Sequence, residues 1–168
     1  LEMSKMSSSE YKLDVSEFDL NELTRICIIG LCNRIDEKNL ELNVDFEDDI
    51  LKVIADKDAI KRVVINLLDN AIKYNKDNGK ITVFVGESAK GVELSVKDTG
   101  IGIPPEDTER IFERFYRVDK SHSKKVGGTG LGLSIVKHVC ACHNATIRVK
   151  SKVGKGTTIY VTFPNNVN

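Results

Sequence analysis

The sequence has no tryptophan, only three prolines and 6% aromatic residues, and it carries no excess of charge of either sign. Its 25 lysine and arginine residues balance 25 aspartate and glutamate residues. A net charge of zero argues against binding to nucleic acid or to an anionic membrane, because both need a one-sided positive field. No apolar run approaches the ~18 residues of a membrane span, and we expect no secretory leader.

Cysteine is scarce and is not arranged for metal binding. The cysteines are Cys27, Cys32, Cys140 and Cys142, and they form no C-x-x-C pair with zinc-site spacing. We expect Cys27 and Cys32 to be small buried residues of a protein from a reducing compartment. The 168 residues suit a single domain whose core needs neither a disulfide nor a metal.

The hydrophobic pattern predicts a fold with both helices and strands. Apolar spacing predicts helices over residues 19–33, 56–74 and 131–142 and a short one over 105–114. Alternation of apolar and polar residues predicts six strands. Residues 40–46 and 50–55 are expected to form one hairpin, residues 81–86 and 92–98 a second hairpin, and residues 146–151 and 158–163 two further strands. Residues 117–130 are polar and glycine-rich, which is typical of a mobile loop. Together these elements predict a two-layer α/β sandwich with a mixed sheet and helices on one face.

The helix expected over residues 56–74 carries polar residues at unusual positions. Asn66, Asn70 and Lys73 are spaced i, i+4 and i+7, so they share one helix face. Asparagine is unfavourable inside a helix. Its amide oxygen is nevertheless a suitable ligand for Mg²⁺, and a lysine one turn further on can reach a phosphate. From this helix alone, a solvated polar face explains the spacing equally well.

A glycine-rich segment directly follows an expected strand. Residues 98–104 read DTGIGIP. The Asp98 carboxylate can accept a hydrogen bond from an exocyclic amine such as that of adenine, and the glycines let a ligand ring approach the backbone. An ordinary turn is the alternative. An aspartic protease is excluded, because that site needs a second carboxylate of the same motif and the sequence has none.

A second glycine-rich segment opens the last expected helix. Residues 127–134 read GGTGLGLS, and the N–H groups of such a loop and of a helix N-terminus attract anions. The segment fits neither a Walker A loop nor a dinucleotide fingerprint. Before it lies IFERFYR at residues 111–117. Its phenylalanines suit core packing, while Arg114 and Arg117 suit a lid over a triphosphate or a solvated basic loop.

These four blocks, in this order, resemble the catalytic ATP-binding domain of sensor histidine kinases, a member of the superfamily that also includes gyrase, MutL-type repair proteins and the large heat-shock chaperones. NLLDNAIKY resembles the N box, DTGIGIP the first glycine box, IFERFYR the F box and GGTGLGLSIVKH the second glycine box. GKGTTIYVTFP resembles the closing strand segment. The resemblance covers roughly residues 18–164 and is nearest to the phosphate-regulon and cell-wall sensor kinases of Gram-positive bacteria.

The resemblance implies a role for each matching residue. Asn70 binds Mg²⁺ with Asn66 in support, Lys73 faces the phosphates, Tyr74 flanks the nucleotide and Asp98 accepts a hydrogen bond from the adenine amine. Further nucleotide contacts are implied for residues of the glycine boxes, the F box, the lid and the closing strand: Gly100, Gly102, Ile103, Phe115, Arg117, Gly128, Thr129, Gly130, Leu131, Gly132 and Thr157. The implied fold has a mixed, mainly antiparallel sheet of about five strands packed on three helices, with a flexible ATP lid.

One position separates the kinases from their relatives. Gyrase, the repair proteins and the chaperones carry a glutamate one turn before the metal-binding asparagine, where it activates water. This chain has Asn66 there, and an amide cannot take a proton as a carboxylate base does. We therefore expect slow hydrolysis and transfer of the phosphoryl group to a histidine on a helical bundle, with the protein supplying positioning and charge stabilisation.

Two departures from the family pattern shape the expectation. The phosphoacceptor H box is absent, since none of His122, His138 and His143 lies in a matching segment. Where relatives carry His-Gly-Gly, this chain has His143-Asn144-Ala145, which leaves the geometry of that turn open because alanine tolerates a left-handed conformation poorly.

The expected organisation follows from the resemblance. Residues 1–17 are expected to be a remnant of an upstream dimerisation helix and linker, and residues 18–168 the catalytic domain, monomeric by itself. The whole would be the cytoplasmic portion of a membrane-anchored sensor that binds Mg-ATP, phosphorylates a separate bundle and acts indirectly on a response regulator. Two alternatives stay open: a stand-alone regulatory ATP-binding module, and an ATPase or serine kinase of the same superfamily.

Overall fold

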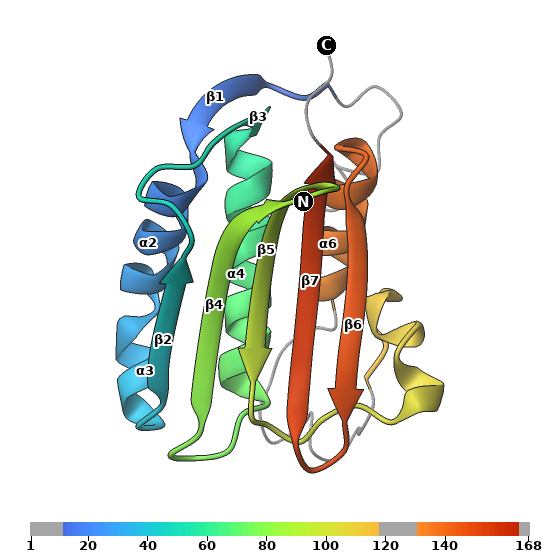
Figure 1. Cartoon of the computed structure of the whole chain (residues 1–168). Coiled ribbons are helices and arrows are strands. Elements are labelled where there is room, and N and C mark those ends of the chain that lie inside the picture. Colours follow the sequence, from blue (N-terminus) through green and yellow to red (C-terminus); the bar gives the residue numbers. More distant parts are fainter. Residues whose placement is uncertain (1–11, 118–130, 165–168) are drawn as a thin grey trace.

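A computed structural model describes residues 12–117 and 131–164 of the chain (Figure 1). A single five-stranded sheet forms one layer, and helices pack against one of its faces. From one edge to the other, its strands are β2 (Glu41–Phe46), β4 (Lys80–Ser88), β5 (Gly91–Asp98), β7 (Gly156–Pro164) and β6 (Thr146–Lys152). β2 runs parallel to β4, and the other neighbours are antiparallel. The expected two-layer sandwich with a mixed, mainly antiparallel sheet is confirmed.

The helical layer consists of α2 (Leu20–Gly30) with its short continuation α3 (Cys32–Glu37), α4 (Lys57–Lys73) and α6 (Gly132–Cys142). α4 lies in the middle and contacts both α2 and α6. It begins where the sequence indicates, because the Asp56 carboxylate accepts a hydrogen bond from the Ala59 N–H at 3.2 Å and so caps the first turn. None of the helices that the structure describes is long and apolar enough to cross a membrane.

The core lies between the two layers. Leu67 and Leu68 of α4 are fully buried, as is Val136 of α6. They face alternate residues of the strands, among them Val83 and Leu94. Each such aliphatic side chain contributes about 1.5–3 kcal/mol on burial. Aliphatic residues supply most of the core, and Phe18 and Phe163 are buried in it as well.

One predicted strand pairing is wrong. Residues 40–46 and 50–55 were expected to form a hairpin, but β2 joins the large sheet. β3 (Lys52–Asp56) pairs antiparallel with β1 (Val15–Asp19) in a separate two-stranded sheet. Alternation reports which face of a strand is buried and not which strand lies beside it.

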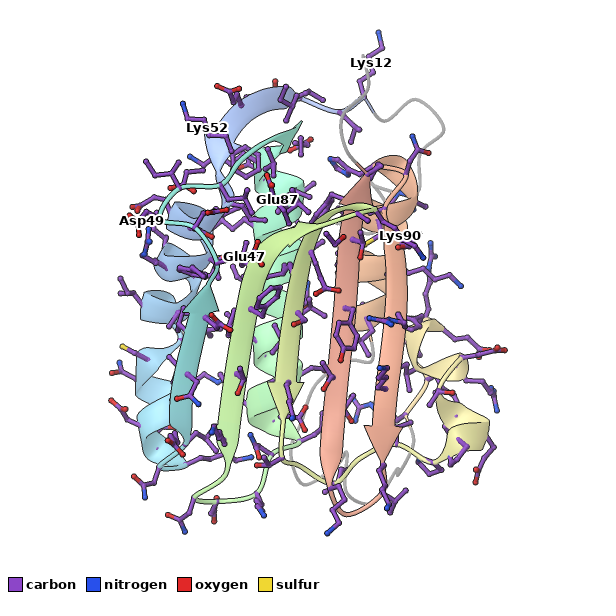
Figure 2. The ribbon with its side chains drawn as sticks, in the orientation of Figure 1. Lys12, Glu47, Asp49, Lys52, Glu87 and Lys90 are labelled. Carbon is purple, nitrogen blue, oxygen red and sulfur yellow. The ribbon has the colours of Figure 1, made fainter. Side chains whose placement is uncertain are left out.

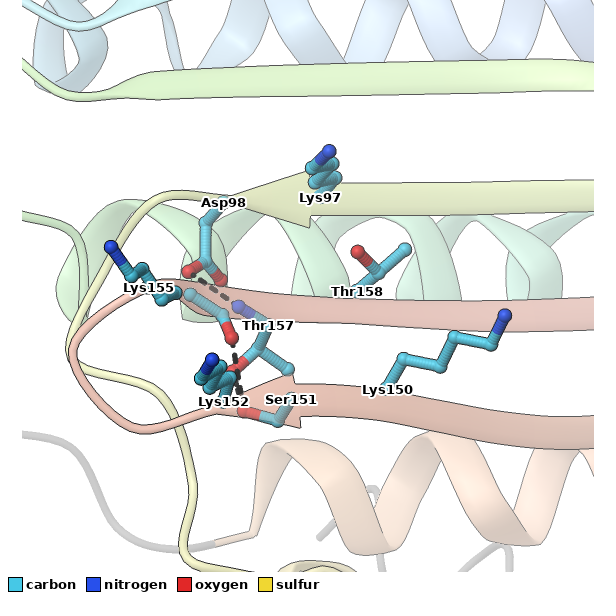
Figure 3. Close-up of a pocket in the computed structure, with 9 residues that line it drawn as sticks. Lys97, Asp98, Lys150, Ser151, Lys152, Lys155, Thr157 and Thr158 are labelled. Carbon is cyan, nitrogen blue, oxygen red and sulfur yellow. Dashed lines mark hydrogen bonds between the residues drawn. The ribbon is translucent and has the colours of Figure 1, made fainter.

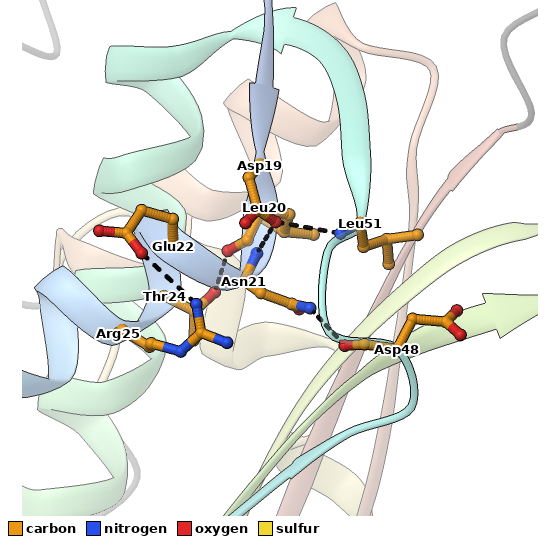
Figure 4. A network of polar contacts seen from close by, with 8 residues as sticks. All are labelled: Asp19, Leu20, Asn21, Glu22, Thr24, Arg25, Asp48 and Leu51. Carbon is orange, nitrogen blue, oxygen red and sulfur yellow. Dashed lines mark hydrogen bonds and ion pairs between the residues drawn. The ribbon is translucent and has the colours of Figure 1, made fainter.

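A polar network holds the segment between β2 and β3 against the start of α2 (Figure 4). The Asp19 carboxylate caps α2 by accepting from Asn21 N–H and also accepts from Leu51 N–H, both at 3.0 Å. The Asn21 side chain donates to the Asp48 carbonyl at 2.8 Å. The acidic residues 47–49 therefore form a crossover tied to a helix, instead of a hairpin turn.

The prediction of a helix over residues 105–114 is also wrong. The structure has two short 3₁₀ turns there, η1 (Pro105–Asp107) and η2 (Arg110–Phe112). Pro105 is the first residue of the first turn, a position that proline favours in helices. The residues after it do not form the consecutive backbone hydrogen bonds of an α-helix. Ile111 is the buried residue of this segment, and η2 contacts α6.

The turn after α6 is completed by its asparagine. Asn144 takes the left-handed conformation with φ of 55°, and Ala145 does not. The Asn144 N–H bonds to the Ala141 carbonyl and the Ala145 N–H to the Cys140 carbonyl, which is a Schellman cap. The helix thus ends normally without the glycines.

Charged side chains of both signs surround the end away from the C-terminus of β5, and Figure 2 labels several of them: Lys12, Glu47, Asp49, Lys52, Glu87 and Lys90. The opposite end carries the loop after β5 and the turn between β6 and β7. All the residues that the sequence singles out on strands lie there.

β1 crosses the expected boundary between residues 17 and 18, because Val15 and Glu17 already pair with β3. Most of the expected dimerisation remnant, residues 1–11, lies outside the described residues. The division of the chain at this point therefore stays a prediction.

Candidate functional site

Asp98 sits at the end of β5, where the strand gives way to the DTGIGIP loop. Its Oδ1 accepts hydrogen bonds from the Gly100 N–H at 2.8 Å and from the Thr157 N–H of β7 at 3.2 Å (Figure 3). None of the described residues donates a hydrogen bond to Oδ2. One carboxylate oxygen is thus fixed by the backbone, and the other is available to a ligand.

Burial dominates the electrostatics of Asp98. Removal from water raises the pKa of this carboxyl from 3.8 to about 6, although the hydrogen bonds from Gly100 and Thr157 act in the opposite direction. A partly buried carboxylate with an open oxygen favours a ligand group that donates a hydrogen bond over one that only accepts, because a buried polar group left without a hydrogen bond costs free energy.

The glycines of the loop allow two backbones to come close. A Cβ on Gly100 would collide with the Tyr74 carbonyl, and the next residue, Ile101, donates its N–H to that carbonyl at 3.1 Å. Gly102 has a φ of 76° and a Cβ there would collide with the Lys152 carbonyl. The loop is thus held between the end of α4 and the β6–β7 turn, which places Asp98 beside both.

Asn75 and Thr99 fasten the same loop to α4. The buried Asn75 side chain accepts from the Thr99 hydroxyl at 3.0 Å and donates to the Lys80 carbonyl at 3.1 Å. The Thr99 hydroxyl in turn accepts from the Lys80 N–H at 2.9 Å. Asn75 was not among the residues predicted from the sequence; its position directly after the N box was the available signal.

The expected polar face of α4 is present. Asn66, Asn70 and Lys73 are all half-buried on that helix. The Asn66 amide donates to the Arg62 carbonyl at 2.8 Å, while none of the described residues hydrogen-bonds to the Asn70 side chain. Lys73 pairs with Asp69 at 2.9 Å. The Lys73 ammonium therefore lies beside a residue one turn earlier in α4, and a change of side-chain rotamer would bring it to an anion bound near the helix.

Asp69 and Lys38 complete the charges around this end of α4. Asp69 also binds Arg34 of α3 at 2.5 Å, so its carboxylate is shared between two cations. The Lys38 ammonium donates to the carbonyls of Ile72, Lys73 and Asn75 at 2.8–3.0 Å. It satisfies the open carbonyls of the helix C-terminus and opposes their negative potential. Desolvation lowers the pKa of Lys38. This cap was not predicted, because the spacing of Lys38 from α4 carries no local signal.

The remaining predicted residues divide into four groups. Tyr74 follows α4, and Ile103 donates its N–H to the Ser151 hydroxyl at 2.7 Å. Phe115, with a φ of 65° and 68% exposure, and Arg117 lie at the end of the first described segment. Leu131 and Gly132 begin α6. Gly128, Thr129 and Gly130, together with the predicted lid, lie outside the described residues.

A shallow pocket of about 280 Å³ opens beside Asp98 and Thr157 (Figure 3). Four lysines line it: Lys97, Lys150, Lys152 and Lys155. Their positive charge is of the sign that a polyphosphate requires, but they are exposed and therefore screened by salt. The pocket borders the Asp98 carboxylate from the strands and not from the α4 face.

The donor set fits a metal that is only partly held by protein. Within residues 12–117 and 131–164, no group of three or more histidine, cysteine or acidic side chains could hold an ion. A neutral amide oxygen such as that of Asn70 suits Mg²⁺, which usually takes one or two protein ligands and completes its shell with water and substrate phosphate. These residues therefore fit a metal that arrives with a phosphate ligand.

Residues 55–167 match the family model described as histidine kinase-, DNA gyrase B- and HSP90-like ATPase. The sensor histidine kinase WalK of Bacillus subtilis is 39% identical over 166 residues, which are 98% of this chain and 27% of WalK. The sensor-like histidine kinase SenX3 of Mycobacterium bovis is 37% identical over 98% of this chain and 40% of its own length. The chain thus spans well under half of these relatives.

Solved structures agree with these matches. The catalytic domain of histidine kinase ThkA superposes with a TM-score of 0.80 at 32% identity, covering 90% of this chain and 96% of that domain. Full-length ShkA in complex with AMPPNP superposes with a TM-score of 0.83 at 26% identity over 96% of this chain and 33% of ShkA. The chain therefore belongs to the histidine kinase-, DNA gyrase B- and HSP90-like ATPase family, as the ATP-binding catalytic domain of a sensor histidine kinase.

Proposed function

We propose that this domain binds Mg-ATP and transfers the γ-phosphoryl group to a histidine on a separate dimerisation bundle, for onward transfer to an aspartate of a response regulator. One observation carries the proposal. The partly buried Asp98 presents an open carboxylate oxygen at one end of the site, while α4 presents amide and ammonium groups but no carboxylate at the Asn66 position.

Asp98 and its loop would bind the base. The open Oδ2 would accept a hydrogen bond from the exocyclic amine of adenine. Gly100 and Gly102 would shape the pocket by letting the loop pack closely against the Tyr74 and Lys152 carbonyls. Tyr74 would flank the nucleotide from the end of α4. Guanine presents a carbonyl oxygen where adenine has its amine, so two acceptors would face each other and GTP would bind less well.

Asn70 would hold Mg²⁺, with Asn66 in support, and the metal would neutralise phosphate charge during transfer. Lys73 would leave Asp69 and contact a phosphate. Because Arg34 still binds Asp69 at 2.5 Å, the carboxylate keeps one cationic partner after Lys73 leaves. The glycines of residues 128–132 would enclose the triphosphate.

Asn66 would determine the fate of the phosphoryl group. Its amide already donates to the Arg62 carbonyl and cannot act as a general base. Water would therefore attack slowly, and the phosphoryl group would await a stronger nucleophile. None of the three histidines lies in a segment that resembles the H box, and both ring nitrogens of His143 are engaged, one by the Val139 carbonyl and one by the Asp56 N–H.

The relatives supply further support. ShkA was solved with AMPPNP, and ThkA was solved in complex with the response regulator protein TrrA, with a TM-score of 0.80 at 31% identity.

We also propose that residues 1–17 join the domain to its dimerisation helices, and that the whole protein is a membrane-anchored sensor with this domain in the cytoplasm.

Mixing the domain with the dimerisation bundle of its own kinase and γ-labelled Mg-ATP tests the proposal. Label should appear on the bundle, be acid-labile as expected of phosphohistidine, and disappear with Asn70→Ala or when the bundle histidine is replaced. Binding of Mg-ATP without transfer to any bundle would instead indicate a regulatory ATP-binding module and would overturn the proposal.

A further inference from the structure

Ser151 of β6 connects three segments that converge on Asp98. Its hydroxyl oxygen lies 2.7 Å from the Ile103 N of the first glycine box. It also lies 3.0 Å from the Gly156 carbonyl and 2.8 Å from the Thr157 hydroxyl (Figure 3). Thr157 also donates its backbone N–H to Asp98 Oδ1. A single side chain thus contacts the loop that follows Asp98 and the residue that orients its carboxylate.

The hydrogen-bonding capacity of a hydroxyl fixes the direction of each contact. Serine has one proton to donate and two lone pairs to accept with. The Ile103 N–H can only donate, so Ser151 accepts a hydrogen bond from it. The Gly156 carbonyl can only accept, so Ser151 donates its one proton to that oxygen. In the remaining contact Ser151 must accept, and Thr157 must donate its hydroxyl proton.

This assignment leaves the Thr157 hydroxyl with no proton for a ligand. Its oxygen retains a lone pair on the residue whose backbone N–H binds Asp98, and Asp98 Oδ2 likewise only accepts when ionised. The two groups then present acceptors alone. At the exocyclic position of the base, acceptors match the amine of adenine and oppose the carbonyl oxygen of guanine. The same hydroxyl without Ser151 would be free to rotate and donate.

We propose that Ser151 is a specificity-determining positioning residue, which fixes the Thr157 hydroxyl as an acceptor and thereby strengthens the preference of the site for adenine nucleotides over guanine nucleotides. The inference rests on the proposed binding of ATP at Asp98. It assigns to Ser151 an effect on the choice of base, distinct from its packing role between the loop and the strands. It predicts that this effect passes through Thr157.

The test compares Mg-ATP and Mg-GTP affinities, by calorimetry or by competition with a fluorescent adenine nucleotide, in four variants. Ser151→Ala releases the Thr157 proton, and the ratio of ATP to GTP affinity should fall about five- to tenfold through loss of one hydrogen-bond preference. Ser151→Thr keeps a hydroxyl and should keep the ratio near that of the wild type. Thr157→Val removes the group that Ser151 controls, so adding Ser151→Ala to Thr157→Val should leave the ratio unchanged.

Each outcome bears on the proposal. Equal loss of ATP and GTP affinity in Ser151→Ala, with the ratio unchanged, would show a purely structural role and overturn it. A change of ratio that persists in the Thr157→Val background would overturn the route through Thr157. If wild-type protein bound neither nucleotide, the proposed function would fail instead, so the two failures are distinguishable. Melting temperatures of all variants report whether they are folded.

Discussion

Gly132, the first residue of α6, faces Asn66 of α4 so closely that a Cβ on the glycine would lie 2.9 Å from the Asn66 amide oxygen. The helix that comes after the predicted lid therefore starts against the side chain that we expect to stand where some relatives carry a catalytic glutamate. Two residues from separate boxes of the sequence meet at one point, and the position of one depends on the smallness of the other.

Replacing Gly132 by alanine should displace the Asn66 side chain and leave the fold intact. Alanine favours a helix over glycine by about 1 kcal/mol, and the group it meets is the end of a side chain that can rotate away. We expect an unfolding free energy within about 1 kcal/mol of the wild type, but weaker Mg-ATP binding. In the Asn66→Ala background the added methyl has room, so Gly132→Ala should no longer affect affinity; a persistent loss there would contradict the contact.

Asn66→Glu should raise the rate of ATP hydrolysis. A carboxylate at this position can accept a proton from an attacking water, which the amide cannot do. Measuring phosphate release over time by the variant and by Asn66→Gln, which has the length of glutamate without its charge, checks the prediction. No increase in Asn66→Glu, or an equal increase in both, would contradict the alignment of the N box.

The raised pKa of Asp98 predicts pH-dependent stability. The carboxyl titrates near 6 in the folded protein and at 3.8 ordinarily, so the folded state holds the proton more tightly. The stability gained from neutral Asp98 is complete below pH 3.8 and is lost as the pH rises through about 6. The ionised group therefore costs stability at neutral pH, and Asp98→Asn should raise the melting temperature there, while its advantage should shrink as the pH falls toward the ordinary pKa of the carboxyl.

The same pKa predicts pH-dependent binding. Adenine recognition needs the ionised carboxylate, so affinity for adenosine, which carries no titrating phosphate, should weaken by up to about tenfold per pH unit below about 6. Asp98→Asn should bind more weakly with a flat pH profile. A flat profile in the wild type would separate Asp98 from the base.

Lys38→Met should destabilise the domain. The variant leaves the carbonyls of Ile72, Lys73 and Asn75 without their charged donor at the C-terminus of α4. Loss of hydrogen bonds to a charged group suggests about 1–3 kcal/mol in chemical denaturation. Lys76→Ala, a change at a nearby exposed lysine, should cost less than about 0.5 kcal/mol. Equal effects of the two changes would remove the capping role.

The helices and strands were largely predictable because their signals are local. The Asp56 cap and the apolar spacing after it locate α4, and alternation locates β4 and β5 nearly to the residue. The pairing of β2 with β4 was not predictable, because nothing within residues 41–56 specifies a partner 39 positions along the chain. The 3₁₀ turns after Pro105 begin with the same residue types as an α-helix, and they differ from one only in the hydrogen bonds that the later residues fail to make.

Within the candidate site, too, only the residues with a local sequence signal were predictable. Motifs identified the residues that would touch a ligand, such as Asp98 and Asn70, because chemistry restricts their type. The residues that hold them in place, Lys38, Asn75 and Ser151, act through backbone groups distant in the sequence. A lysine that caps a helix from another element has no spacing rule, so only the folded structure assigns it.

Binding of an adenine nucleotide between Asp98 and α4 is the central claim about this domain. Calorimetric titration of Mg-ATP into the wild-type domain, Asp98→Ala and Asn70→Ala tests it directly. We predict one site per chain in the wild type, loss of measurable binding in Asp98→Ala, and loss of the Mg²⁺-dependent part of the affinity in Asn70→Ala. Absence of binding to the wild type, or equal affinity in all three proteins, would contradict the claim.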